Sequence, residues 1–371
     1  MAGGARGVVW GGAGALRRGA GGGGGGGGAR GPGARGAVAQ PLAEGPAVFA
    51  EGRGAVSAWA RAQRAAIAQA PAARRGDLER EFEWLLEDAA ARGGRGAGPG
   101  PGMGPCGGNL RLRRPLGALR RLWDARMEDR VPYQYLAGAC HWYDMVLAVG
   151  PGVLIPRPET EELLDLAKAH IKGARVGAGG GAWADLGTGS GALAIGLART
   201  LPRPVAGHGA PAVWAVDASP VARLYAAANA ERQGVSGAVR VVGGSWFDPL
   251  KGLEGQLDGI VSNPPYIPSE DLPGLQAEVG CHEPALALDG GSGDGLGSLV
   301  PVAEGSARFL REGGFFGVET NGHGQAQLLA ARMACMAAAA PGRATAGAAF
   351  RDVRVVPDLS GVERFVTAVK A

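Results

Sequence analysis

The sequence predicts an α/β fold, a doubly wound sheet of seven mostly parallel strands preceded by a small N-terminal helical domain. From residue 182 onward, strand-like apolar segments alternate with helix-like segments. Two of those strands end in turn-forming motifs, one rich in glycine and one containing two prolines. Before residue 130 the apolar residues recur at helical spacing instead. Strand–helix alternation favours a parallel sheet covered on both faces, and such sheets bind ligands at the carboxyl ends of their strands.

The first 43 residues differ in composition from the rest of the chain. They contain five arginines, no lysine, no acid and a run of eight glycines, Gly21 to Gly28. Such a segment buries too little apolar surface to offset the entropy lost on ordering, so we expect it to be disordered. Its Arg-rich, acid-free composition resembles an organelle transit peptide, although serine is absent. We expect the chloroplast rather than the mitochondrion, and an untargeted tail is the alternative.

Charge and cysteine usage restrict the function classes. Removing the five leader arginines from the net charge of +4 leaves −1, so the body of the chain is nearly neutral. Direct nucleic-acid binding is therefore not expected, because it requires a basic surface. Four separated cysteines without a C-x-x-C motif and five scattered histidines predict neither disulfides nor a metal site, and fit a reducing compartment. No apolar run is long enough for a membrane span, and we expect a monomer.

Residues 44–130 are predicted to form the helical domain. Helices are expected over residues 55–70, 78–91 and 110–127, with a Gly/Pro-rich insertion at residues 93–108. The third helix carries several arginines, which could meet an acidic partner or RNA, or form a solvated face. A hairpin bridge is expected at residues 131–160, followed by the α/β domain at residues 161–371.

The elements of the α/β domain follow from its alternating pattern. Strands are expected at residues 182–186, 213–216, 239–242, 257–262, 315–319, 353–356 and 364–369. Helices are expected at residues 192–200, 221–233, 296–310 and 325–340, and a loop of about thirty residues follows the fourth strand. A further helix begins near Thr160. Pro156 and Pro158 prevent a helix before Glu159, and Thr160 can cap it. This helix start leaves Arg157 without a role.

The strand at residues 257–262 ends in Asn263-Pro264-Pro265-Tyr266, which we term the clamp. The prolines have no N–H and cannot continue a strand ladder, so they form a rigid turn. Asn263 offers an amide oxygen, the turn carbonyls lose their ladder partners, and Tyr266 offers a flat apolar face. These features predict a binding site for a planar group with N–H donors, such as an amide or an exocyclic amine. A stiff turn capped by an Asn is the alternative.

Residues 185–191, Asp-Leu-Gly-Thr-Gly-Ser-Gly, form a glycine loop between a predicted strand and helix. The G-x-G-x-G spacing differs from the dinucleotide fingerprint, so no pyrophosphate cradle is implied. Asp217, at the end of the next strand, can accept from both hydroxyls of a ribose, or cap the following helix. Trp246 can flank an adenine ring or serve as a core or lid aromatic. Together these residues favour S-adenosylmethionine over NAD.

The glycine loop, Asp217 and the clamp together resemble a class I S-adenosylmethionine-dependent methyltransferase, with its Rossmann-like fold, directed at an amine or amide. Two further stretches, residues 131–138 and 152–161, resemble the release-factor glutamine methyltransferase family. The resemblance continues through Glu283-Pro284, residues 294–296 and 358–361 to Arg364, and covers about residues 110–370. The chain departs from the family pattern at His141-Trp142, where a Phe-type residue is usual, and within residues 318–322.

The resemblance implies a role for each motif. The cofactor S-adenosylmethionine would be bound by Asp185, Gly187, Thr188, Gly189, Ser190, Gly191, Asp217, Trp246 and Asn263. The substrate would be the glutamine of a Gly-Gly-Gln loop in a peptide-chain release factor, held by Arg157, Asn263, Pro264, Pro265 and Tyr266. We expect the Asn263 side-chain oxygen and the Pro264 carbonyl to accept the two amide hydrogens. The nitrogen lone pair, normally delocalised into the carbonyl, would then face the methyl donor.

Three other functions remain possible from the residues. A nucleic-acid adenine-N6 methyltransferase would share the clamp, but it normally needs a target-recognition domain and a basic surface. A glutamine methyltransferase acting on a ribosomal protein is hard to separate by motif. A non-catalytic adaptor that keeps the fold is disfavoured by the intact glycine loop, Asp217 and clamp.

Overall fold

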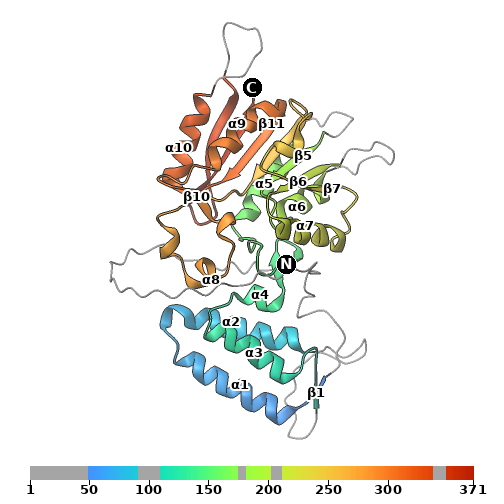
Figure 1. Ribbon diagram of the computed structural model, residues 1–371, viewed down its shortest axis with the longest axis vertical. Coiled ribbons are helices and arrows are strands. Elements are labelled where there is room, and N and C mark those ends of the chain that lie inside the picture. Colours follow the sequence, from blue (N-terminus) through green and yellow to red (C-terminus); the bar gives the residue numbers. More distant parts are fainter. Residues whose placement is uncertain (1–48, 91–108, 174–180, 202–210, 337–347) are drawn as a thin grey trace, which may run out of the picture.

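The computed structural model describes residues 49–90, 109–173, 181–201, 211–336 and 348–371 (Figure 1). The predicted leader and the Gly/Pro-rich insertion lie outside the described residues, as does the end of the helix expected to reach residue 340. A sheet flanked by helices occupies one end of the molecule and a group of helices the other, with α4 (Tyr133–Ala137) and α8 (Ala277–Gly280) between them.

The central sheet has seven strands in the order β12-β13-β11-β8-β5-β6-β7. Its strands are β5 (Trp183–Leu186), β6 (Val213–Asp217), β7 (Val239–Gly243), β8 (Leu257–Ser262), β11 (Leu310–Glu319), β12 (Phe350–Pro357) and β13 (Glu363–Lys370). The five strands from β11 to β7 pair in parallel, and β13 runs antiparallel to both of its neighbours. The prediction of a mostly parallel, seven-stranded sheet is confirmed.

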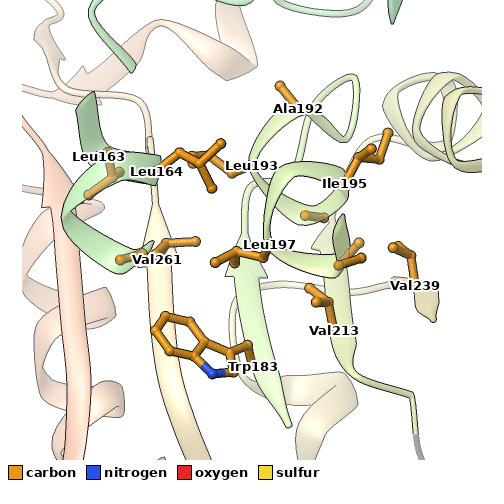
Figure 2. Close-up of a cluster of buried hydrophobic side chains, with 14 of the residues drawn as sticks. Leu163, Leu164, Trp183, Ala192, Leu193, Ile195, Leu197, Val213, Val239 and Val261 are labelled. Atoms are coloured by element: carbon orange, nitrogen blue, oxygen red, sulfur yellow. The ribbon is translucent and has the colours of Figure 1, made fainter. Parts of the chain in front are cut away.

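Helices cover both faces of the sheet, so the doubly wound prediction is also confirmed. One core cluster contains residues of α5 (Thr160–Gly173), α6 (Ala192–Thr200) and α7 (Pro220–Arg232). Figure 2 shows Leu164 of α5 next to Leu193 of α6, with Leu197 of α6 above the strands. The second cluster contains α9 (Leu299–Phe309) and α10 (His323–Ala334). The strands form nearly continuous apolar runs in the sequence, because a helix layer covers each face of the sheet.

The helices of the N-terminal region are α1 (Arg53–Ala68), α2 (Ala72–Ala89) and α3 (Leu116–Met127), which pack around a separate core that includes Trp59, Phe82 and Trp123. One expectation here is wrong. Residues 110–112, assigned from their apolar spacing to the third helix, lie in β2 (Asn109–Leu112), paired antiparallel with β1 (Phe49–Gly52). Pro115 precedes the helix because its fixed φ suits a helix start.

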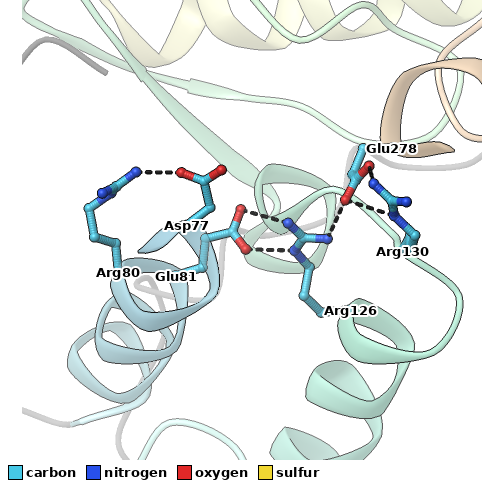
Figure 3. A network of polar contacts seen from close by, with 6 residues as sticks. All are labelled: Asp77, Arg80, Glu81, Arg126, Arg130 and Glu278. Atoms are coloured by element: carbon cyan, nitrogen blue, oxygen red, sulfur yellow. Dashed lines mark hydrogen bonds and ion pairs between the residues drawn. The ribbon is translucent and has the colours of Figure 1, made fainter. Parts of the chain in front are cut away.

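A buried ion-pair network joins these helices to the α/β region (Figure 3). Arg126 of α3 donates to Glu81 of α2 at 2.6 Å and to Glu278 of α8 at 2.9 Å. Arg130 contacts the same Glu278 carboxylate. Burial alone would raise the pKa of Glu278, but hydrogen bonds from Arg130 and Arg126 lower it to about 2. Arg126 is only 4% exposed and lies between two carboxylates, so replacing it by an uncharged residue would take the ion pair away from the largely buried Glu81.

The segment after α4 and the segment after β8 contain short secondary-structure elements. After α4, strands β3 (Ala139–Trp142) and β4 (Met145–Ala148) form a hairpin. The predicted thirty-residue loop after β8 is more ordered than expected: β9 (Ile267–Pro268) pairs with β10 (Asp289–Gly291), and α8 and three-residue turns η2 (Leu272–Gly274) and η3 (Ala285–Ala287) lie between them. Among the described helices, none has the length and apolarity to cross a bilayer.

Candidate functional site

The register of the strands brings the sequence motifs together at the carboxyl ends of neighbouring strands. Leu186 pairs with Ser262, so the glycine loop leaves β5 beside the point where the clamp leaves β8. On the other side of β8, Val318 pairs with Ser262, so Glu319 ends β11 next to Asn263. Ser262 is fully buried, and its hydroxyl donates to the Leu186 carbonyl at 2.6 Å. The carboxyl ends of three adjacent parallel strands therefore form the site, as parallel sheets generally arrange.

Gly187 is the point at which the glycine loop, the clamp and Trp246 meet. A side-chain Cβ at Gly187 would lie 3.6 Å from Trp246 Cζ3 and 3.8 Å from the Asn263 carbonyl oxygen. Gly187 has φ of +74° and Trp246 has φ of +46°, which is unusual for a bulky residue. Such conformations persist only where surrounding structure enforces them, and they concentrate at functional sites. Trp246 is half-buried against the second core cluster.

Two carboxylates hold the glycine loop. Asp185, only 1% exposed, accepts the Thr188 hydroxyl at 2.6 Å and the Ala194 N–H at 3.0 Å through Oδ2. Within the described residues its Oδ1 has no partner, and burial raises the pKa of Asp185 to about 7. Asp217 accepts the Gly189 N–H and the Ser219 N–H, each at 2.8 Å. Burial likewise raises the pKa of Asp217.

The remaining residues of the glycine loop divide by exposure. Thr188 and Ser190 are buried, and the Ser190 carbonyl accepts from Asn229 at 2.9 Å. A Cβ at Gly191 would meet the Ala226 backbone at 3.2 Å, so this glycine allows α6 to pack on α7. A Cβ added at Gly189 would have no described atom within 4 Å. The open side of the loop is therefore at Gly189.

The clamp is oriented by residues far away in the chain. Asn263 Nδ2 donates to the Thr160 hydroxyl at 3.0 Å, and Thr160 donates to Glu319 Oε2 at 2.6 Å. The Tyr266 hydroxyl donates to Glu319 Oε1 at 3.2 Å. Gln325 of α10 donates to the Tyr266 carbonyl at 2.9 Å. Within the described residues no donor contacts Asn263 Oδ1 or the Pro264 carbonyl, so neither acceptor has a partner there.

Arg157 is tied to the segment that follows the clamp. Its guanidinium donates to Glu283 at 2.5 Å, and the second Glu283 oxygen accepts the Ile155 N–H at 3.1 Å. The Trp142 indole N–H donates to the Arg157 carbonyl at 2.8 Å. Glu283 is buried while the Arg157 side chain remains 30% exposed. Arg157 thus has a structural partner, and its side chain is partly exposed.

The structure brings most of the predicted site residues together, and it shows that the sequence analysis overlooked two. Gly187, Trp246 and Asn263 converge, and Asp217 reaches Gly189. Thr160, expected to cap a helix, is instead the first helical residue, and its hydroxyl connects Asn263 to Glu319. Glu319 lies in the segment where the chain departs from the family pattern, and nothing in that segment singles it out. Both residues form hydrogen bonds with partners more than 50 residues away in the sequence, and no local sequence pattern marks such a contact.

Comparisons with known proteins agree with this geometry. The family model described as Methyltransferase small domain matches residues 170–273. Release factor glutamine methyltransferases from Thermosynechococcus vestitus and Gloeobacter violaceus are each 43% identical, over 70% of this chain and 81% and 82% of their own lengths. The protein of that name from Synechocystis sp. is 40% identical, over 67% of this chain and 77% of its own length. A solved ribosomal protein L11 methylase from Lactobacillus delbrueckii subsp. bulgaricus is 19% identical, covers 60% of this chain and 83% of that one, and has a TM-score of 0.36, too low to bear on function.

Proposed function

We propose, because the chain belongs to the release factor glutamine methyltransferase family, that it methylates the side-chain amide nitrogen of the glutamine in the Gly-Gly-Gln motif of a peptide-chain release factor. The methyl donor is S-adenosylmethionine. The observation that carries the proposal is that the clamp begins beside the glycine loop, with the Asn263 main-chain carbonyl 3.8 Å from the Cβ position of Gly187, while Asn263 Oδ1 and the Pro264 carbonyl have no partner among the described residues.

The residues at the sheet edge fit this cofactor. Gly189 leaves room on one side of the loop, and Trp246 lies against Gly187. The Asp217 carboxylate has two backbone partners and keeps further lone pairs that can accept from ribose hydroxyls. Asp185, by contrast, is fully enclosed, so we assign it to the shape of the loop and not to direct contact. Thr188, Ser190 and Gly191 support the loop in the same way.

The clamp residues perform the reaction by positioning. S-adenosylmethionine, when bound, supplies an electrophilic methyl group. Asn263 Oδ1 and the Pro264 carbonyl accept the two N–H groups of the substrate amide, which fixes the nitrogen between the clamp and the glycine loop. Pro265 keeps the turn rigid, and Tyr266 offers a flat surface to the planar amide. Fixed acceptors in a partly dry site stabilise the charge that develops on the nitrogen without reorganisation.

A transfer assay tests this function directly. The full chain is incubated with S-adenosylmethionine labelled in its methyl group and one of four acceptors: a release factor, the same factor with the Gly-Gly-Gln glutamine changed to alanine, total ribosomal protein, and duplex DNA. We expect label on the unaltered release factor alone. Undiminished label on the altered factor, or preferential label on DNA or ribosomal protein, would exclude the proposed substrate.

We further propose that the chain acts as a monomer in an organelle, a plastid rather than a mitochondrion, and contacts no nucleic acid directly. The acid-free leader of 43 residues and the cyanobacterial relatives support the location, and the nearly neutral body supports the absence of nucleic-acid contact. A fluorescent fusion at the C-terminus of the full chain should enter plastids, and deletion of residues 1–43 should leave it in the cytosol. Retained plastid import after deletion would contradict a targeting role, and elution as a dimer in size-exclusion chromatography would contradict the monomer.

A further inference from the structure

The carboxylate of Glu319 holds both ends of the clamp. One of its oxygens reaches Asn263 through the Thr160 hydroxyl, and the other accepts the Tyr266 hydroxyl. Glu319 and Thr160 are 1% and 5% exposed, so water competes little for these bonds. In the described part of the chain no lysine or arginine forms an ion pair with Glu319. A buried carboxylate without a direct cation is costly, which calls for a functional reason.

The direction of the hydrogen bonds determines how the Asn263 amide is turned. A threonine hydroxyl has one proton, and when Glu319 is ionised Thr160 donates it to that carboxylate. Towards Asn263, therefore, Thr160 has only lone pairs to offer. It can accept from the amide NH2 but cannot donate to the amide oxygen. A flipped Asn263 would place two acceptors against each other, so the orientation with Oδ1 free is favoured as long as Glu319 is ionised.

We propose that Thr160 and Glu319 are positioning residues that orient the Asn263 amide so that the clamp selects the nitrogen of the substrate amide for methylation. This inference rests on the proposed function. With Oδ1 free, Asn263 accepts from the NH2 group of the substrate. A flipped Asn263 would present N–H donors, which pair with the substrate oxygen and place that oxygen, not the nitrogen, at the clamp.

The test compares two substitutions at Thr160 in the full chain. Thr160→Val keeps the shape but removes the hydroxyl, whereas Thr160→Ser keeps the hydroxyl. With a release factor as substrate, we expect Thr160→Val to lower kcat by about 10- to 100-fold and to change the Kd for S-adenosylmethionine by less than about 2-fold. Thr160→Ser should retain kcat within about 3-fold. Equal kcat values for the two variants would overturn the proposal.

A double substitution separates orientation from general stability. If Thr160 acts only through Asn263, adding Thr160→Val to Asn263→Ala lowers kcat no further. A further loss as large as that of Thr160→Val alone would overturn the proposal. Should Thr160→Val fail to fold, Glu319→Gln and Glu319→Met give the same contrast, because Gln keeps an acceptor for the Thr160 hydroxyl and Met does not. Equal kcat values for that pair would also overturn it. Failure of the proposed function is recognised separately, since the unaltered enzyme would then leave the release factor unlabelled.

Discussion

The glycine loop and the clamp are neighbours at the sheet edge, but they are held in different ways. Asp185 and Asp217 bind the loop through its own backbone and hydroxyl groups, over separations of 3, 9 and 28 residues. The clamp is held by side-chain contacts over separations of 53, 103 and 159 residues. The first region is a local structure that offers space to a cofactor, and the second is a long-range assembly that presents two acceptors.

This difference predicts that substitutions in the two regions have separable kinetic effects. The largest is expected for Asn263→Ala, which removes an acceptor that contacts the reacting group. We expect kcat to fall on the order of 100-fold or more, as for removal of one preorganised group from a transition-state site. The Kd for S-adenosylmethionine, measured by calorimetry, should change little. Equal losses in kcat and cofactor affinity would mean that Asn263 does not act on the substrate amide.

The matching substitution in the loop region is Asp217→Ala, with the opposite pattern expected. It removes the carboxylate from Gly189 and from the proposed ribose contact, each a charge-assisted hydrogen bond. Bonds of this kind contribute about 1.5–3 kcal/mol, so the Kd for S-adenosylmethionine should rise by about 10- to 100-fold. At saturating cofactor, kcat should stay within about 3-fold of the unaltered enzyme. A change confined to kcat would remove Asp217 from the cofactor site.

The same contrast explains what the sequence could and could not predict. Residues 185–191 are consecutive, so their glycines and acid are visible as a motif, and Asp217 follows at the end of the next strand. The clamp residues are also consecutive, and the chemistry of Asn263 could be inferred from them. Thr160 and Glu319 were not recognised because their roles depend on strand register, which pairs Val318 with Ser262. Register is a property of the folded sheet and leaves no local signature.

Errors in the fold prediction have a related cause. Residues 110–112 carry helix-like spacing, yet they form β2 because β1 supplies a strand partner about sixty residues earlier in the chain. The sheet itself was predictable, since nearly continuous apolar strands separated by helices admit few arrangements. The segment between β8 and α9 was not, because its short elements are organised by contacts such as those of Glu278 with Arg126 and Arg130.

Titration offers a third way to separate the regions, because each contains a buried acid. Burial raises the pKa of Glu319 to about 7, offset in part by the Thr160 hydrogen bond, the charge of Arg364 and the Tyr266 hydrogen bond, while Glu159 raises it further. Below that pH the protonated carboxyl donates to Thr160, which frees the Thr160 proton for Asn263 Oδ1 and allows the amide to flip. We therefore expect kcat to fall by about 10-fold per pH unit below about 7 and to level off above it.

Stability should move in the opposite direction. The folded protein binds the Glu319 proton more tightly than the unfolded chain, whose Glu pKa is about 4.5, so this group's stabilising contribution is lost as pH rises from about 4.5 to about 7. Burial also raises the pKa of Asp185, so its stabilising contribution is likewise lost as pH rises. Because Asp185 lies in the glycine loop, its titration should alter cofactor affinity.

Glu319→Gln should flatten the pH profile of kcat and leave the pH dependence of cofactor affinity intact. A kcat profile unchanged by Glu319→Gln would assign it to another group.

The smallest effect distinguishes two glycines within the loop itself. Gly189 and Gly191 both have positive φ, at +55° and +87°, so alanine at either position costs about 1–2 kcal/mol of folding free energy. Only at Gly191 does the new methyl also meet backbone, the Ala226 Cα at 3.2 Å, which adds about 1 kcal/mol or more. Gly191→Ala should therefore unfold at lower denaturant than Gly189→Ala. Gly189→Ala should instead weaken S-adenosylmethionine binding, because its methyl enters the space that the loop leaves open. If Gly189→Ala binds the cofactor with unchanged affinity, that open side of the loop faces solvent and not the ligand.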